Sequence, residues 1–283
     1  MRRRVIETVT GTPAVDGAGV HLVRVLGQQT VYRFDPFLML DAFDSYDPQD
    51  YIKGFPMHPH RGIETFTYLM EGRIDHEDSL GNKGTIHGGE SQWMTGGSGI
   101  LHQEMPQPAE HLLGLQLWIN LPAKDKMTEP KYFDITTDMV KTVDEGNASV
   151  RVVAGKYKNH QGVKGHHVQV NVLEIKVKPN EFFSMETDPE ENLFVYIVEG
   201  EGRFGSDSSG VLPRKVAALF DKGDEFYVRA TEQGIRFILF SGKPLREQVV
   251  WGGPIVMNTR EDLFTAFEEL SNGNFIRHKI HHS

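Results

Sequence analysis

Two short segments carry residue types that ligate transition metals, each with a spacing of two residues. His58 and His60 stand in the first segment, and His102 and Glu104 stand about 40 residues further along the chain. Residues two apart on a β-strand point to the same face, so each pair can place both side chains in one pocket. If the two strands face each other across a barrel, three imidazoles and one carboxylate converge, a set that suits Fe, Mn, Co, Ni, Cu or Zn. Four protein ligands leave positions of an octahedral ion open, as an enzyme requires.

A His-x-His pair alone is a weak signal, because a chain with 13 histidines contains some pairs by chance. The matching His-x-Glu after a glycine-rich turn strengthens it, and the alternative interpretation is a set of surface loop residues near proline and glycine. Glu64 is a competing carboxylate, since it has the same parity as the two histidines of the first segment. It could instead be a strand residue paired with Arg61 or Arg73. The sequence leaves the choice between Glu64 and Glu104 as fourth ligand open.

The elements that must position these residues are short strands, separated by glycine and proline. Strands are expected over residues 19–26, 65–70, 116–121, 168–177, 193–198, 217–220 and 236–240. His76 and His87 lie between the two candidate segments and are interpreted as parts of a polar hairpin. One helix is expected over residues 259–270, with Thr259 as N-cap and Gly273 beyond its end. This pattern predicts an all-β protein built as a sandwich or barrel.

An internal repeat predicts two domains. The run that begins at Thr65 and ends in Glu71-Gly72 recurs 128 residues later as the run that begins at Leu193. In both copies a strand ends in Glu-Gly and a return strand follows. The seam falls in the polar stretch of residues 135–147, which predicts domains at 1–134 and 135–283.

Composition excludes several classes of function. The 283 residues carry a net charge of −9, so binding to a phosphate backbone by charge alone is not expected. Cysteine is absent, which excludes disulfides, thiolate metal sites and cysteine nucleophiles. No apolar window is long enough to span a membrane. Together with the lack of an apolar leader, these features favour a cytoplasmic protein, or a nuclear one in a eukaryote.

The longer motifs around the candidate ligands resemble those of a known family. These motifs are His58–Thr65, Tyr68–Gly72 and Gln92–Met105, with Gly19–Leu26 and Asp35–Asp41 before them. They are similar to the pirin family of the cupin superfamily, densely over about the first 135 residues and more loosely beyond. The resemblance implies a bicupin: two antiparallel, jelly-roll-like β-barrels with a few short helices.

The resemblance also implies one metal in the N-terminal barrel, usually iron, with other divalent transition metals (Mn, Ni, Co, Cu, Zn) as alternatives. Carried onto the matching positions, the ligands would be His58, His60, His102 and Glu104. The repeat predicts that the second barrel is metal-free, because its corresponding positions hold no imidazole. They are Glu186, Asp188, Asn192, Arg236 and Ile238.

Some pirin-like proteins are similar in activity to flavonol dioxygenases, which open the heterocycle of quercetin with O2 and release carbon monoxide. A metal would lower the pKa of the flavonol 3-hydroxyl, and Glu104 could accept its proton as general base. Fe(II) is favoured because zinc cannot transfer an electron. The expected partners are a flavonol-like small molecule and O2. The expected pocket walls are Phe55, Met57, Met94 and Met105.

The alternative function is an iron-binding, redox-sensitive regulatory protein that acts through protein–protein contacts. It would serve as a transcription coregulator without direct DNA contact, or as a modulator of a metabolic enzyme. A third interpretation is a bicupin with another small-molecule substrate, because a fold does not fix a function.

Overall fold

The structure is a computed structural model that describes residues 1–278 and consists mostly of antiparallel strands, which confirms the all-β prediction. The chain forms two compact units. The first unit comprises residues 12–31, 36–137 and those from 245 onward; the second comprises residues 1–11, 32–35 and 138–244. The domain boundary at residues 134 and 135 stays a prediction, and residues 279–283 of the expected second domain lie outside the described residues.

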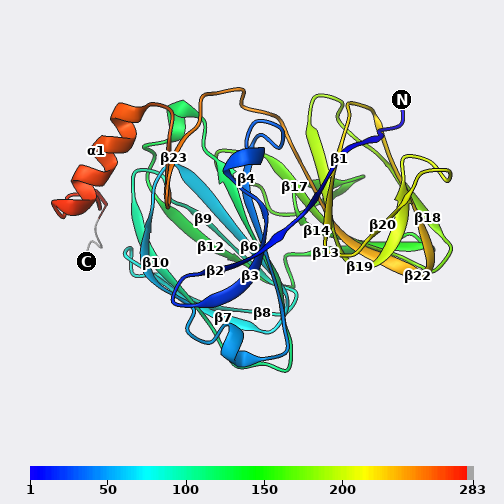
Figure 1. Ribbon diagram of the computed structural model, residues 1–283, viewed down its shortest axis with the longest axis horizontal. Helices are drawn as coiled ribbons and strands as arrows, with labels where there is room; N and C mark the ends of the chain where they lie inside the picture. Colours follow the sequence, from blue (N-terminus) through cyan, green and yellow to red (C-terminus); the bar gives the residue numbers. More distant parts are fainter. Residues whose placement is uncertain (279–283) are drawn as a thin grey trace. The chain divides into compact units, whose positions relative to one another are not determined.

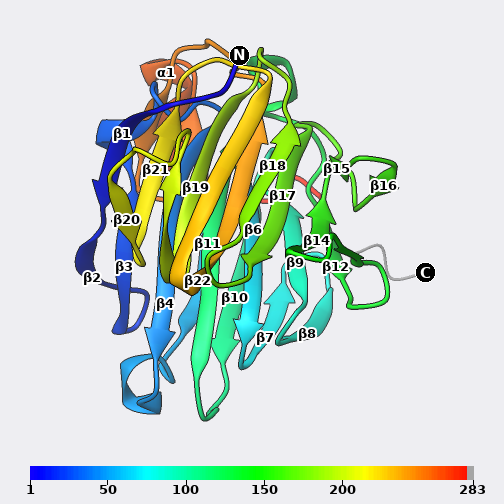
Figure 2. The same ribbon diagram turned by 90° about the vertical axis from the view of Figure 1, so that its right-hand side faces the viewer.

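Two antiparallel sheets make up most of the first unit. The larger has the strand order β12-β9-β6-β11-β4-β3-β2, and the smaller has the order β5-β10-β7-β8. The strands of the larger sheet are β2 Thr12–Asp16, β3 Val20–Leu26, β4 Phe37–Ser45, β6 Ile63–Glu71, β9 Ser91–Thr95, β11 Leu112–Asn120 and β12 Lys131–Ile135. Those of the smaller sheet are β5 Phe55–His60, β7 Arg73–Asp78, β8 Lys83–His87 and β10 Ile100–Pro106. Figure 2 shows β7 and β8 side by side in the smaller sheet.

The two sheets of the first unit face each other across an apolar core. Leu69 and Leu112 of the larger sheet are buried in one cluster with Ile74 and Ile86 of the smaller sheet. Because successive side chains of a strand point to opposite faces, one face of each strand supplies this core. The same alternation directs the polar side chains of the candidate site into the space between the sheets.

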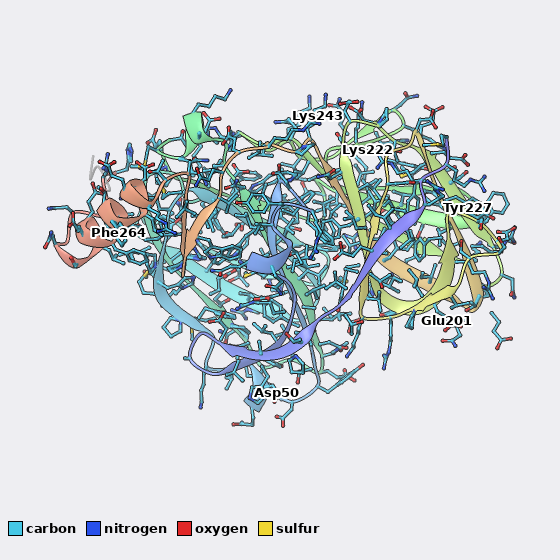
Figure 3. The ribbon with its side chains drawn as sticks, turned by 45° about the horizontal axis from the view of Figure 1, so that its top comes forward. Asp50, Glu201, Lys222, Tyr227, Lys243 and Phe264 are labelled. Atoms are coloured by element: carbon cyan, nitrogen blue, oxygen red, sulfur yellow. The ribbon has the colours of Figure 1, made fainter. Side chains whose placement is uncertain are left out.

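The C-terminal segment adds β23 (Val250–Gly252), β24 (Ile255–Met257) and α1 (Arg260–Ser271) to the first unit. The helix prediction is confirmed: the Thr259 hydroxyl accepts a hydrogen bond from the backbone N–H of Asp262 at 3.1 Å, as an N-cap does. The helix contacts β23 and β24 (Figure 1). Phe264 projects from its outer side and is 66% exposed (Figure 3). Short 3-10 helices span Gln28–Thr30, Pro48–Asp50 and Ala123–Asp125.

The second unit is built on one nine-stranded sheet. Its order is β1-β21-β19-β22-β17-β14-β13, with β18 paired to β22 and β20 paired to β19. The strands are β1 Val5–Thr10, β13 Lys141–Asp144, β14 Ala148–Ala154, β17 Val170–Val177, β18 Phe182–Glu186, β19 Asn192–Phe204, β20 Val211–Pro213, β21 Val216–Phe220 and β22 Glu225–Gly242; β15 (Lys156–Tyr157) and β16 (His160–Gln161) form a separate pair. Over residues 1–278, no helix has the length and apolar character needed to cross a membrane.

Candidate metal centre

Three imidazoles meet where β5 pairs with β10. The antiparallel register places His58 opposite His102 and His60 opposite Ile100. His58 and His60 therefore lie on one face of β5, next to His102. One ring nitrogen from each of the three histidines lies within 4.8 Å of the other two. The structure thus brings together the three histidines that the two-residue spacing singled out.

The hydrogen bonds of His58 and His60 fix which nitrogen of each ring carries a proton. Nδ1 of His58 lies 3.0 Å from the Pro56 carbonyl oxygen, and Nδ1 of His60 lies 3.1 Å from the Pro254 carbonyl oxygen. A carbonyl only accepts, so both Nδ1 atoms donate, and in neutral rings both Nε2 atoms keep a lone pair. The two Nε2 atoms are 3.1 Å apart. Two lone pairs at this distance repel each other unless a cation lies between them.

His102 supports the same conclusion. Both of its ring nitrogens are buried and have no hydrogen-bond partner among the described residues. Burial, with a smaller effect of His58, lowers the pKa of His60 to about 3, and burial holds the pKa of His102 well below its ordinary value. Both imidazoles are therefore neutral near pH 7, which is the form that binds metals. The donor set fits a transition-metal ion.

Glu104 lies on the same face of β10 as His102 and lines the same cavity as His58 and His60. Its carboxylate is 6% exposed and accepts hydrogen bonds from side chains of the facing sheet. Thr67 Oγ1 donates to Oε1 at 3.0 Å, Gln92 Nε2 also donates to Oε1, and Gln116 Nε2 is 3.5 Å from Oε2. Glu104 is not part of the group whose ligand atoms lie within 4.8 Å of one another, and its carboxylate is held by neighbours that the sequence analysis did not identify.

Glu64 points elsewhere. The parity argument that placed it with the histidines fails, because Arg61 and Gly62 interrupt the strand and Gly62 has a φ of +77°. The Glu64 carboxylate accepts hydrogen bonds from Trp93 Nε1 at 3.1 Å and Thr95 Oγ1 at 2.9 Å. Burial raises its pKa to about 7.

Neither arginine considered as a partner of Glu64 pairs with it. Arg61 pairs with Glu269, and Arg73 pairs with Asp75. The buried position of Glu64 is instead satisfied by the two neutral donors of β9.

The predicted hairpin forms from the paired strands β7 and β8, with His87 exposed on it, but His76 faces inward. Its ring is buried, stacks on Tyr132 with centroids 4.0 Å apart, and lies 5.4 Å from the His102 ring. The nearest polar partner is Asp78, with Nε2 3.6 Å from Oδ2. The register explains this position: His76 lies opposite Glu104, so it faces the interior as Glu104 does.

A cavity of about 700 Å³ opens next to the histidines. Its aromatic lining residues are Phe43, Phe55, Trp118 and Trp251. Phe55 agrees with the predicted pocket wall, whereas Met57, Met94 and Met105 do not line this cavity. Met57 and Met105 alternate with His58 and Glu104 along their strands, so they face away from it.

The second unit lacks a comparable cluster. Over residues 1–278, the three histidines are the single group of at least three His, Asp or Glu side chains whose ligand atoms converge. Arg236, which the repeat aligns with a ligand position, instead donates to the buried Glu174 carboxylate at 2.7 Å.

The amino-acid sequence was compared with known protein families and with individual proteins. The family model described as Pirin matches residues 19–119, and the model described as Pirin C-terminal cupin domain matches residues 172–276. The chain is 40% identical over 279 residues to a Pseudomonas aeruginosa protein named "putative quercetin 2,3-dioxygenase", covering 96% of this chain and 97% of that one. The chain belongs to the pirin family. A pirin-like protein of Caulobacter vibrioides is 39% identical over 277 residues, covering 96% of this chain and 99% of the relative.

A solved structure agrees with this assignment. The crystal structure of quercetin 2,3-dioxygenase from Acinetobacter baumannii superposes with a TM-score of 0.88 at 30% identity, covering 97% of this chain and 99% of that one. In a pirin fold, the three-histidine cluster indicates a site for a divalent metal.

Proposed function

We propose that this pirin-family protein is a metal-dependent dioxygenase that opens flavonols such as quercetin with O2. The observation that carries the proposal is the position of three imidazoles and one carboxylate beside a cavity with aromatic lining residues. The names of the Pseudomonas and Acinetobacter relatives support the same reaction.

His58, His60, His102 and Glu104 would hold the metal, which we propose is Fe(II), within a domain formed by residues 1–134. When bound, a redox-active divalent ion would acidify a coordinated hydroxyl and allow electrons to pass between the substrate and O2. The second domain, residues 135–283, would carry no metal, because Glu186 and Asp188 replace the imidazoles of the first motif and Arg236 and Ile238 replace His102 and Glu104.

The protein side chains have separate tasks in this reaction. Glu104 accepts the proton of the flavonol 3-hydroxyl, because its carboxylate lies on the cavity wall and remains an acceptor. Trp118 and Trp251, with ring centroids 5.6 Å apart, offer flat surfaces for the planar rings of the substrate.

The test is oxygen consumption by iron-loaded protein supplied with quercetin, followed together with loss of the flavonol absorbance and release of carbon monoxide. We expect His60→Ala and Glu104→Gln to abolish turnover, and His87→Ala, an exposed histidine of the same unit, to leave it unchanged. Absence of oxygen consumption at one iron per chain would overturn the proposal. That result would favour the regulatory function, in which the iron centre controls binding to a protein partner.

A further inference from the structure

A row of polar side chains crosses the inner face of the larger sheet beneath Glu104. Thr67 lies opposite Gln92 on one side and opposite Gln116 on the other. These three side chains, which we call the cradle, are 1%, 2% and 8% exposed respectively. Buried polar groups require partners, and those of the cradle meet the carboxylate of Glu104, which comes from the facing sheet.

Counting protons identifies the donor that holds Glu104. The Thr67 hydroxyl has one proton but two acceptors in reach, Glu104 Oε1 and Gln116 Oε1. The Gln92 amide has two protons, which reach Glu104 Oε1 and Thr67 Oγ1. Gln92 therefore has one proton for each of its two acceptors, whereas Thr67 does not, and the Gln116 amide comes no closer than 3.5 Å to Glu104.

The Glu104 carboxylate fixes the orientation of the Gln92 amide. The Tyr132 hydroxyl has one proton, which it donates to Asp134, so its 3.3 Å approach to Gln92 Oε1 does not select an orientation. The opposite orientation of the amide would place Gln92 Oε1 against a carboxylate oxygen of Glu104, and two acceptors repel each other.

The two oxygens of Glu104 are consequently not equivalent. Oε1 accepts from Gln92 and lies 3.0 Å from Thr67 Oγ1, whereas the one cradle contact of Oε2 is a 3.5 Å approach of Gln116. We propose that Gln92 is the positioning residue of the Glu104 carboxylate: it occupies Oε1 and leaves Oε2 as the oxygen that serves the metal. The inference rests on the proposed role of Glu104 as a ligand.

The experiment uses the full chain loaded with cobalt(II) alone, whose visible spectrum reports the ligand geometry. Gln92→Leu keeps the volume of the side chain approximately and removes its donors. We expect a changed cobalt spectrum and a metal affinity 10- to 100-fold lower, on the order found for other supporting residues of metal ligands. Thr67→Val, which removes the other donor to Oε1, should change the spectrum in the same direction and serves if Gln92→Leu does not fold.

The matched control is Thr95→Val. Thr95 lies on the same strand as Gln92 and is 1% exposed, but it donates to Glu64. A purely structural effect would lower the unfolding temperature of Gln92→Leu and of Thr95→Val alike. The cobalt spectrum should change only when the cradle is lost. An unchanged spectrum and affinity in Gln92→Leu, or in Thr67→Val if Gln92→Leu does not fold, would overturn the inference, as would an equal change in Thr95→Val. Cobalt binding requires no flavonol turnover, so failure of the dioxygenase proposal is observed separately.

Discussion

The Nε2 atoms of His58 and His60 face each other at 3.1 Å, while the Nδ1 atom of each ring faces a backbone carbonyl oxygen. When both rings are neutral, this arrangement leaves two lone pairs opposed in a site where His60 is 1% exposed. A divalent cation relieves that opposition, so metal binding and stability of the first unit should be coupled.

The first prediction concerns this coupling. Addition of a divalent transition metal to chelator-treated protein should raise the unfolding temperature, because a ligand at 100 times its Kd stabilises the folded state by about 2.7 kcal/mol. Differential scanning fluorimetry measures the shift. His60→Ala should lose it, and His87→Ala should retain it. An equal shift in His60→Ala would show that the metal binds elsewhere.

The second prediction concerns Glu64 and pH. Its folded-state pKa of about 7 lies above the ordinary value of 4.5, so folding favours the protonated form. The stability that it contributes is fully present below about pH 4.5 and is lost as the pH rises through about 7. Glu64→Gln mimics the protonated carboxyl group. Over that pH range its free energy of unfolding should become higher than that of the wild type, by up to about 3 kcal/mol.

The measurement is urea unfolding of both proteins at about pH 5 and about pH 7.5. For each protein, the difference between the two free energies of unfolding gives the pH dependence of its stability. The exposed Glu110→Gln serves as the control. Equal pH dependence in wild type and Glu64→Gln would contradict the assignment.

The third prediction concerns substrate binding. Trp251 lines the cavity and donates its Nε1–H to the Gly253 carbonyl oxygen at 2.7 Å, which holds the indole in place. Trp251→Ala should raise KM for quercetin about 10-fold with little change in kcat, because stacking acts equally on bound substrate and transition state. Trp251→Phe should be intermediate, and Phe264→Ala on the exposed side of α1 should be neutral. Steady-state kinetics decide this, and a fall in kcat alone would assign Trp251 a different role.

The fourth prediction concerns Lys126, a lysine that is 2% exposed. Its Nζ donates to Gly62 O at 2.8 Å, Asn120 Oδ1 at 2.6 Å and Val256 O at 2.9 Å. Lys126→Met would leave these three acceptors without that donor and should lower the free energy of unfolding by about 2–4 kcal/mol. The exposed Lys124→Met should change it by less than about 0.5 kcal/mol. Chemical denaturation gives both values, and similar losses in the two variants would contradict the argument.

The sequence was sufficient where the governing rule is local. The alternation of side chains along a strand predicted that His58 and His60 share one face, and that Glu104 shares the face of His102. The N-cap at Thr259 was predicted from residue type and position alone. The same rule would have excluded Met105 from the cavity wall, because it is adjacent to the inward-facing Glu104, but it fails for Phe55, which shares the parity of Met57 and yet lines the cavity.

Contacts between distant segments could not be predicted in this way. The Pro254 carbonyl that orients His60 comes from 194 positions further along the chain. No local pattern shows that Trp251 reaches the same cavity. The cradle could be predicted only in part. Polar residues within buried strands, such as Gln92 and Thr67, indicate that a buried polar partner exists. The sequence does not show that this partner is Glu104, because that depends on how two sheets face each other. At Gly62 a local rule failed instead. The alternation of strand residues predicted that Glu64 faces the histidines, but the positive φ of Gly62 interrupts the strand and turns Glu64 to another face.

Anomalous diffraction from crystals grown with Fe(II) would locate the metal itself. We expect one peak per chain, within coordination distance of Nε2 of His58 and of His60, a ring nitrogen of His102 and Oε2 of Glu104. No peak at these atoms in fully loaded crystals, or a peak in the second unit instead, would contradict the assignment of the metal centre and the reaction proposed for it.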